Sequence, residues 1–174
     1  MSSRTRITQA FLWASTFAWG IGLGAKIFDL LVVAGAWGAS PPASFALLPY
    51  GPKYPMSPGG FFQPLSIFMA ITIVGALVAG WNQPRAVRPW LLAGTGAFVV
   101  IWAITPTIFW PMINAQYDIA TGKAVASVAQ AVELTARWRA WDGFRIALIA
   151  VGFLASVRAL TLATPGIRLP AGEV

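Results

Sequence analysis

The sequence predicts an all-α protein, an antiparallel bundle of four transmembrane helices with one proline-rich extracytoplasmic loop. Three observations lead to this fold class. The 174 residues are 57% hydrophobic and 10% charged, whereas about a quarter of the residues of a soluble domain are charged. Four apolar runs each reach the roughly twenty residues that cross a bilayer. Residues 1–174 contain no internal repeat, and a chain of this length is typical of one domain, so we expect a single integral membrane domain.

The first span is predicted over residues 7–37, after a short basic segment. A cleavable signal peptide has an apolar core of roughly 7–15 residues, so this longer run is interpreted as a retained helix. Its length requires tilt or projection beyond the lipid. Gly20 and Gly24, spaced four apart, predict one face for close contact with another helix.

Residues 38–60 form the predicted proline-rich loop. Prolines at this density prevent a helix from continuing; they are Pro41, Pro42, Pro49, Pro52, Pro55 and Pro58. The aromatic residues Phe45, Tyr50 and Tyr54 favour an ordered cap that lies on the bundle. A floppy loop is the alternative.

The second and third spans are predicted over residues 61–81 and 90–113, joined by a short polar turn. Pro106 and Pro111 are expected to bend or stop the third span near its end. The fourth span is predicted over residues 141–162. The more polar connector before it has helical composition, which indicates either a surface helix or an outward extension of the fourth span.

The basic residues of the turns and termini predict the orientation. Six fall at the end that holds both termini and four at the opposite end; the six are Arg4, Arg6, Arg85, Arg88, Arg158 and Arg168, and the four are Lys53, Lys123, Arg137 and Arg139. Cytoplasmic segments carry the excess of basic residues. We therefore expect both termini in the cytoplasm and a protein of a bacterial inner membrane.

The composition also excludes several kinds of chemistry. The chain has no Cys and no His, which excludes disulfides, thiol catalysis, zinc sites built from thiolate or imidazole, and His-ligated haem. Five acidic residues make a carboxylate di-metal site hard to build, so we expect no metal site. The cofactor is unknown at this point, and any cofactor would be one that binds without imidazole. The scattered basic residues argue against nucleic-acid binding.

Polar residues gather at the predicted extracytoplasmic end, where the first and third spans finish and the second and fourth begin. A charged residue inside a membrane is costly and indicates a functional site with a nearby partner. We predict Asp142, Asp29 and Arg145 as catalytic residues, with either Asp as the acid or base. The predicted substrate-binding residues are Lys26, Gln63, Asn114, Tyr117 and Arg139. Alternatively the charges only neutralise each other, Lys26 with Asp142 or Asp29 with Arg145, as contacts between helices.

Several short segments resemble a known family. Pro111-Met112-Ile113-Asn114 and, after the connector, Trp138-Arg139-Ala140-Trp141-Asp142-Gly143-Phe144-Arg145 are similar to the anthrone-oxygenase-like family of small four-helix membrane proteins. Residues 37–42 and 59–62 also resemble it. The resemblance implies a four-helix membrane topology and oxidation of polycyclic phenolic substrates without a metal.

Two functions follow from these observations. The first is a membrane-embedded, metal-free enzyme, oxygenase- or isomerase-like, that acts on an apolar, oxygen-bearing small molecule entering from the lipid bilayer. The alternative is a non-catalytic subunit of a larger membrane assembly, since nine tryptophans and many small residues suit contacts between helices. The expected partners are lipid, a hydrophobic small molecule, and a homo-oligomer or larger membrane complex.

Overall fold

The computed structural model describes residues 3–48 and 56–164, and within these ranges every regular element is a helix. The predicted all-α class is therefore confirmed. The elements are α1 (Ser3–Phe28), the π-helical turn η1 (Asp29–Val33), α2 (Ala34–Trp37), the 3-10 turn η2 (Ala43–Leu47), α3 (Pro58–Gly80), α4 (Arg88–Ile104), the π-helical turn η3 (Thr105–Phe109), α5 (Trp110–Ala120) and α6 (Val128–Ala163).

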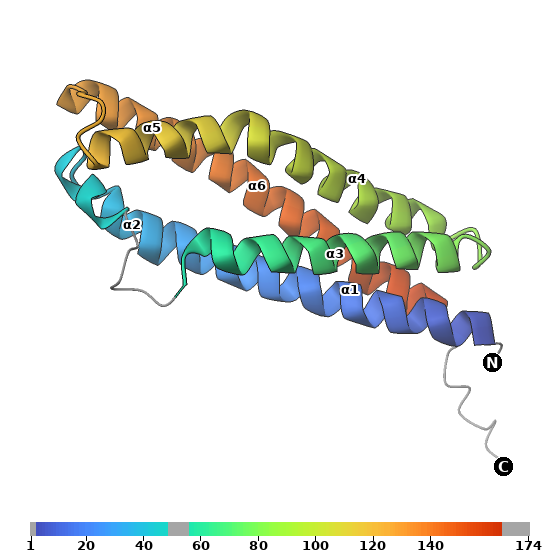
Figure 1. Cartoon of the computed structure of the whole chain (residues 1–174). Coiled ribbons are helices and arrows are strands. Elements are labelled where there is room, and N and C mark those ends of the chain that lie inside the picture. Colours follow the sequence, from blue (N-terminus) through green and yellow to red (C-terminus); the bar gives the residue numbers. More distant parts are fainter. Residues whose placement is uncertain (1–2, 49–55, 165–174) are drawn as a thin grey trace, which may run out of the picture.

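These elements form four long antiparallel rods (Figure 1). The first rod is α1, η1 and α2, the second is α3, the third is α4, η3 and α5, and the fourth is α6. Helix α1 packs against α3 and α6, and α4 packs against the same two helices, so the rods form a closed ring. We call the end that holds η2 and the turn between α5 and α6 the loop end, and the opposite end the terminal end.

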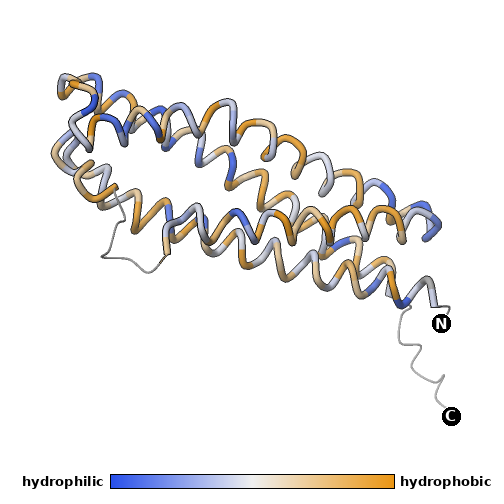
Figure 2. Tube along the Cα trace, viewed as in Figure 1, coloured by the Kyte–Doolittle hydropathy of each residue, from blue (hydrophilic) through white to orange (hydrophobic). Residues whose placement is uncertain are grey.

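Each rod is long and apolar enough to cross a membrane. The four candidate spans are Thr5–Trp37, Pro58–Gly80, Arg88–Ala120 and Val128–Ala163. Large apolar side chains such as Phe17, Leu31, Val78 and Leu154 point outward and are exposed, as expected of helices that contact lipid. Figure 2 shows hydrophilic residues concentrated toward the two ends of the bundle.

Two of the predicted spans are longer than expected. Pro106 does not stop the third rod: it lies in η3, where the chain forms a π-helical turn and continues as α5 to Ala120. A wider turn is one way for a helix to accommodate a proline, which lacks an N–H and clashes with the preceding turn. The fourth rod begins at Val128, because Ser127 and Gln130 form a capping box at its start. The helical connector thus extends the fourth span outward.

The described part of the proline-rich loop packs onto the bundle. Phe45 in η2 is fully buried, and its ring centroid is 6.2 Å from that of Trp37. This part of the loop therefore has the form of the predicted cap. Predictions for Pro49, Tyr50, Pro52, Lys53, Tyr54, Pro55 and Arg168 fall outside the described residues.

The interior consists of three apolar layers stacked along the bundle. The layer at the loop end, which we call the aromatic layer, contains Trp37, Phe45, Phe109, Met112 and Trp138 with three smaller residues. The middle layer surrounds Trp19, and the third lies at the terminal end around Leu91. The ionisable side chains described next lie between the aromatic layer and the middle layer.

The glycine contacts differ from the predicted pair. A Cβ on Gly20 would lie 3.4 Å from the ring of Phe153, but a Cβ on Gly24 would have no neighbour within 4 Å, so of this pair Gly20 alone faces another helix. The closest approach is at Gly152, where a Cβ would lie 2.3 Å from the indole of Trp19. Glycine is required there because the indole ring occupies the space of a side chain.

Candidate functional site

Four of the predicted site residues meet in the interior of the bundle, and we call them the ionic cluster: Lys26, Asp29, Asp142 and Arg145. The ammonium of Lys26 donates a hydrogen bond of 2.5 Å to Oδ2 of Asp29 and lies 3.0 Å from Oδ1 of Asp142. The guanidinium of Arg145 donates to the same Oδ1, through Nε at 2.9 Å and through Nη2. Two cations and two carboxylates therefore alternate in one row of ion pairs, and the net formal charge of these four side chains is zero.

The ionic cluster is shielded from its surroundings. Asp142 is 0% exposed, Lys26 5% and Asp29 9%, and the side chain of Arg145 is 14% exposed. A charge held away from water must be paired, and removing one partner leaves the other uncompensated. The four side chains therefore depend on one another.

Local helix geometry explains how the pairs form. Lys26 and Asp29 are three residues apart in the first rod, as are Asp142 and Arg145 in α6, and this spacing places each pair on one helix face. Two antiparallel rods then bring the pairs together. Asp29 is also the first residue of the π-helical turn η1, and such turns occur frequently at functional sites.

Aromatic rings surround both cations. The ammonium of Lys26 lies 5.2 Å from the ring centroid of Phe62 and 5.5 Å from that of Trp138. The guanidinium carbon of Arg145 lies 3.7 Å from the ring centroid of Phe109, the last residue of η3. The negative faces of these rings stabilise positive charge where water is absent.

One fully buried polar atom of the ionic cluster has no hydrogen-bond partner in the protein. Oδ2 of Asp142 is buried and accepts no hydrogen bond, while both cations near this residue contact Oδ1. A buried acceptor without a partner costs about 1–3 kcal/mol. Oδ2 is therefore a buried acceptor of this cluster that is free to accept a hydrogen bond from a ligand or a water.

The ionic cluster lies deeper than the sequence analysis placed it. Asp142 was expected near the first residue of the fourth span, but α6 begins at Val128. At about 1.5 Å per residue, Asp142 is about 21 Å along the helix from its first residue. The site is thus inside the bundle rather than at a helix end.

The other predicted site residues do not join the ionic cluster. Gln63 and Asn114 are exposed on the outside of the bundle. Tyr117 is partly buried and packs against the aromatic layer. Arg139 is exposed and donates from Nη2 to the main-chain carbonyl of Ala34 at 3.1 Å. It thereby ties the end of the first rod to α6.

A residue without an assigned role stands out in the aromatic layer. Gln116 in α5 is 0% exposed, and neither atom of its amide has a hydrogen-bond partner in the protein. The indole N–H of Trp138 is likewise buried and unpaired. Gln116 lies four residues after Met112 and therefore on the same helix face as this core residue. That spacing was the signal in the sequence that the amide points inward.

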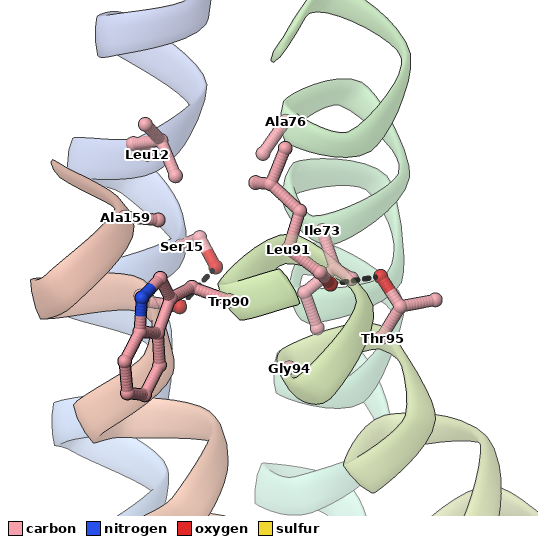
Figure 3. Close-up of a pocket in the computed structure, with 10 residues that line it drawn as sticks. Leu12, Ser15, Ile73, Ala76, Trp90, Leu91, Gly94, Thr95 and Ala159 are labelled. Atoms are coloured by element: carbon pink, nitrogen blue, oxygen red, sulfur yellow. Dashed lines mark hydrogen bonds between the residues drawn. The ribbon is translucent and has the colours of Figure 1, made fainter. Parts of the chain in front are cut away.

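A small cavity lies apart from the ionic cluster, in the terminal half of the bundle (Figure 3). Leu12, Trp90 and Thr95 are among the residues that line it, and the hydroxyls of Ser15 and Ser156 beside it are 3.1 Å apart. Its volume of about 10 Å³ is close to the minimum for one water molecule. It is too small to hold an organic substrate.

Comparison with known proteins gives one match. The family model described as anthrone oxygenase matches residues 57–155, a segment that includes Gln116, Trp138, Asp142 and Arg145 but not Lys26. No curated protein and no solved structure matches the chain. Within the described residues, no group of three acidic side chains comes close enough to hold a metal ion.

Proposed function

The chain belongs to the anthrone oxygenase family, and from this premise we propose that it oxidises an apolar, oxygen-bearing polycyclic substrate at the ionic cluster. The family gives a membrane oxygenase-like role, and four membrane-length apolar helices agree with a substrate that dissolves in lipid. The observation that carries the proposal is the unpaired Oδ2 of Asp142 beside two cations.

The reaction that the family name describes has a simple balance. An anthrone carries a methylene group opposite a ketone, and an oxygenase uses dioxygen. The methylene loses two hydrogens and gains one oxygen atom, so that CH2 and O2 give C=O and H2O. The substrate is oxidised by four electrons, and dioxygen, the co-reactant, is reduced by four.

Asp142 is the proposed base. Its free Oδ2 accepts a proton from the methylene carbon, and the electron pair left behind delocalises onto the ketone oxygen of the substrate. The cations Lys26 and Arg145 stabilise this negative charge, and a fixed positive charge is most effective where water is excluded. Asp29 is a positioning residue, because it holds the ammonium of Lys26 at 2.5 Å.

Dioxygen then reacts with the deprotonated carbon. A carbon–oxygen bond forms, and the resulting peroxide takes the proton back from Asp142. Oδ2 removes the second hydrogen of the former methylene as a proton, the oxygen–oxygen bond breaks, and the carbonyl forms. The hydroxide that leaves takes the proton from Asp142 and becomes water, which restores the carboxylate.

Turnover by the purified full-length chain in lipid nanodiscs tests this proposal. The probe is 1,8-dihydroxyanthrone, with oxygen uptake and quinone absorbance as readouts and empty nanodiscs as the measure of spontaneous oxidation. General-base catalysis contributes about 10²–10⁴-fold, so Asp142→Asn should lower kcat by that range. Glu133→Gln removes an exposed carboxylate from the same helix and should retain the rate.

Two results would contradict the proposal. A wild-type rate no greater than that of empty nanodiscs would rule out oxidation of this substrate class. A folded Asp142→Asn variant with the wild-type rate would rule out Asp142 as the base. Isolation of the chain in mild detergent only together with other subunits, without turnover, would support the non-catalytic alternative.

A further inference from the structure

We propose that Gln116 is a substrate-binding residue whose amide binds a hydroxyl group and the neighbouring carbonyl of the substrate. This inference rests on the proposed function and extends it to substrate selection. The amide has two N–H donors and a carbonyl acceptor. Both its nitrogen and its oxygen are buried without a hydrogen-bond partner in the protein.

The surroundings of Gln116 make an unpaired amide costly. The side chain is fully buried, and the same face of α5 contributes Met112 to the aromatic layer. A polar group buried without hydrogen bonds destabilises the folded state, whereas an apolar side chain of similar shape would not. A bound molecule that supplies both a donor and an acceptor would remove this cost.

The position of Gln116 relative to the ionic cluster fits one ligand that reaches both. Phe109 marks the depth of the ionic cluster, because its ring contacts the guanidinium of Arg145. Gln116 is about two helical turns further toward the loop end, or about 10 Å along α5. Trp138, whose indole N–H is also unpaired, packs edge-to-face on Phe109 with ring centroids 6.3 Å apart. Three side chains with unpaired polar atoms, Asp142, Trp138 and Gln116, thus lie along the bundle from the ionic cluster toward the loop end.

The chemistry of the amide indicates the chemical class of the ligand. An amide presents a donor and an acceptor side by side, and its complement is a molecule with an acceptor beside a donor. A phenolic hydroxyl next to a ketone on a fused-ring system presents this pattern when the hydroxyl proton turns from the ketone to the amide oxygen, so that the two hydrogen bonds of the amide replace the internal one of the ligand. Because the amide is fully buried, such a molecule reaches it only when the helices around the aromatic layer move apart.

Binding of two probes under anaerobic conditions tests the inference, since without dioxygen neither probe is consumed. The probes are 1,8-dihydroxyanthrone, which has the hydroxyl beside the ketone, and unsubstituted anthrone, which lacks it. Quenching of tryptophan fluorescence in nanodiscs gives each Kd. We expect the wild type to bind the dihydroxy compound at least about tenfold more tightly. Gln116→Leu should bring the two Kd values together without lowering the unfolding midpoint.

Control variants keep the test decisive. Gln9→Leu removes an amide that is paired, since Gln9 donates to the carbonyl of Ala163 at 3.3 Å, and it should leave the Kd ratio unchanged. Gln116→Met, which keeps the length of the side chain, replaces Gln116→Leu if the latter does not fold. It should abolish the discrimination in the same way.

The outcomes separate this inference from the proposed function. Equal Kd values in the wild type, no binding of either probe, or an unchanged ratio in the Gln116 variants would each overturn it. An unchanged ratio with a lower unfolding midpoint would show that the amide binds internal water only. Wild-type discrimination that is lost in Gln116→Leu, without any oxygen uptake, would support the binding site and reject the oxygenase.

Discussion

The ammonium nitrogen of Lys26 lies 3.0 Å from Oδ1 of Asp142 and 2.5 Å from Oδ2 of Asp29. One cation from the first rod therefore serves two carboxylates, one on its own rod and one on α6. The guanidinium of Arg145 completes the balance of charge. This arrangement joins the first and last helices across a largely apolar interior, so it contributes both to the fold and to the candidate site.

Removal of Lys26 is predicted to destabilise the bundle strongly. Lys26→Met leaves two buried carboxylates with one cation, and loss of one partner from a buried ion pair costs about 3–5 kcal/mol. We expect a loss of that size in the free energy of unfolding, measured by denaturant titration in detergent micelles.

The double variant Lys26→Met with Asp29→Asn provides the control. It removes one charge of each sign and leaves the pair of Asp142 and Arg145, so most of the lost stability should return. Equal stability of the single and double variants would show that Lys26 does not compensate Asp29.

Exchange of the second cation is predicted to have a graded effect. Arg145 donates two hydrogen bonds to Oδ1 of Asp142 and stacks on Phe109, and a lysine retains the charge but not this planar geometry. Arg145→Lys should lower the free energy of unfolding by about 1–3 kcal/mol. Arg145→Met should lower it further, because Asp142 then keeps only the cation that it shares with Asp29. A higher free energy of unfolding for Arg145→Met than for Arg145→Lys would contradict this view of the site.

The sequence was sufficient for the topology because membrane-spanning helices leave a strong signal in composition. It also identified the four residues of the ionic cluster, because an ionisable side chain in an apolar run is costly in lipid and usually faces the bundle interior, where it pairs with another charge. The pairing of Lys26 with Asp142, rather than Asp29 with Arg145, depends on the rotation of two helices about their axes. Hydropathy does not contain this information.

The errors have physical causes of the same kind. Gln63 and Asn114 lie at the predicted end of the bundle but on outward faces, which only the packing determines. Asp142 lies farther from the start of its helix than the hydropathy pattern predicts, because the capping box of Ser127 and Gln130 starts α6 at Val128. Of the two outcomes expected at Pro106, a stop does not occur, because a π-helical turn accommodates the proline and the helix continues as α5.

The orientation in the membrane remains a prediction that labelling can test. The chain has no Cys, so each introduced cysteine reports alone. Ala124→Cys lies in the exposed turn between α5 and α6, and Ala86→Cys in the exposed turn between α3 and α4. The excess of basic residues at the terminal end predicts that this end is cytoplasmic. A membrane-impermeant maleimide should therefore label intact cells at residue 124 and not at residue 86. The reverse pattern would place both termini outside the cytoplasm.

The contact between Gly152 and Trp19 leads to the last prediction. A Cβ at Gly152 would lie 2.3 Å from the buried indole, closer than any non-bonded contact, and the ring is enclosed by the middle layer. Gly152→Ala should therefore push α6 away from α1 and cost about 1–3 kcal/mol or more of the free energy of unfolding. Gly96→Ala is the matched control, because it lies in the exposed face of α4 with no neighbour within 4 Å. Alanine there should stabilise the helix by up to about 1 kcal/mol.

Because Asp142 and Lys26 lie on these same two rods, displacement by Gly152→Ala should also weaken their ion pair. The coupling energy of Lys26→Met with Gly152→Ala should then differ from zero, whereas that of Lys26→Met with Gly96→Ala should not.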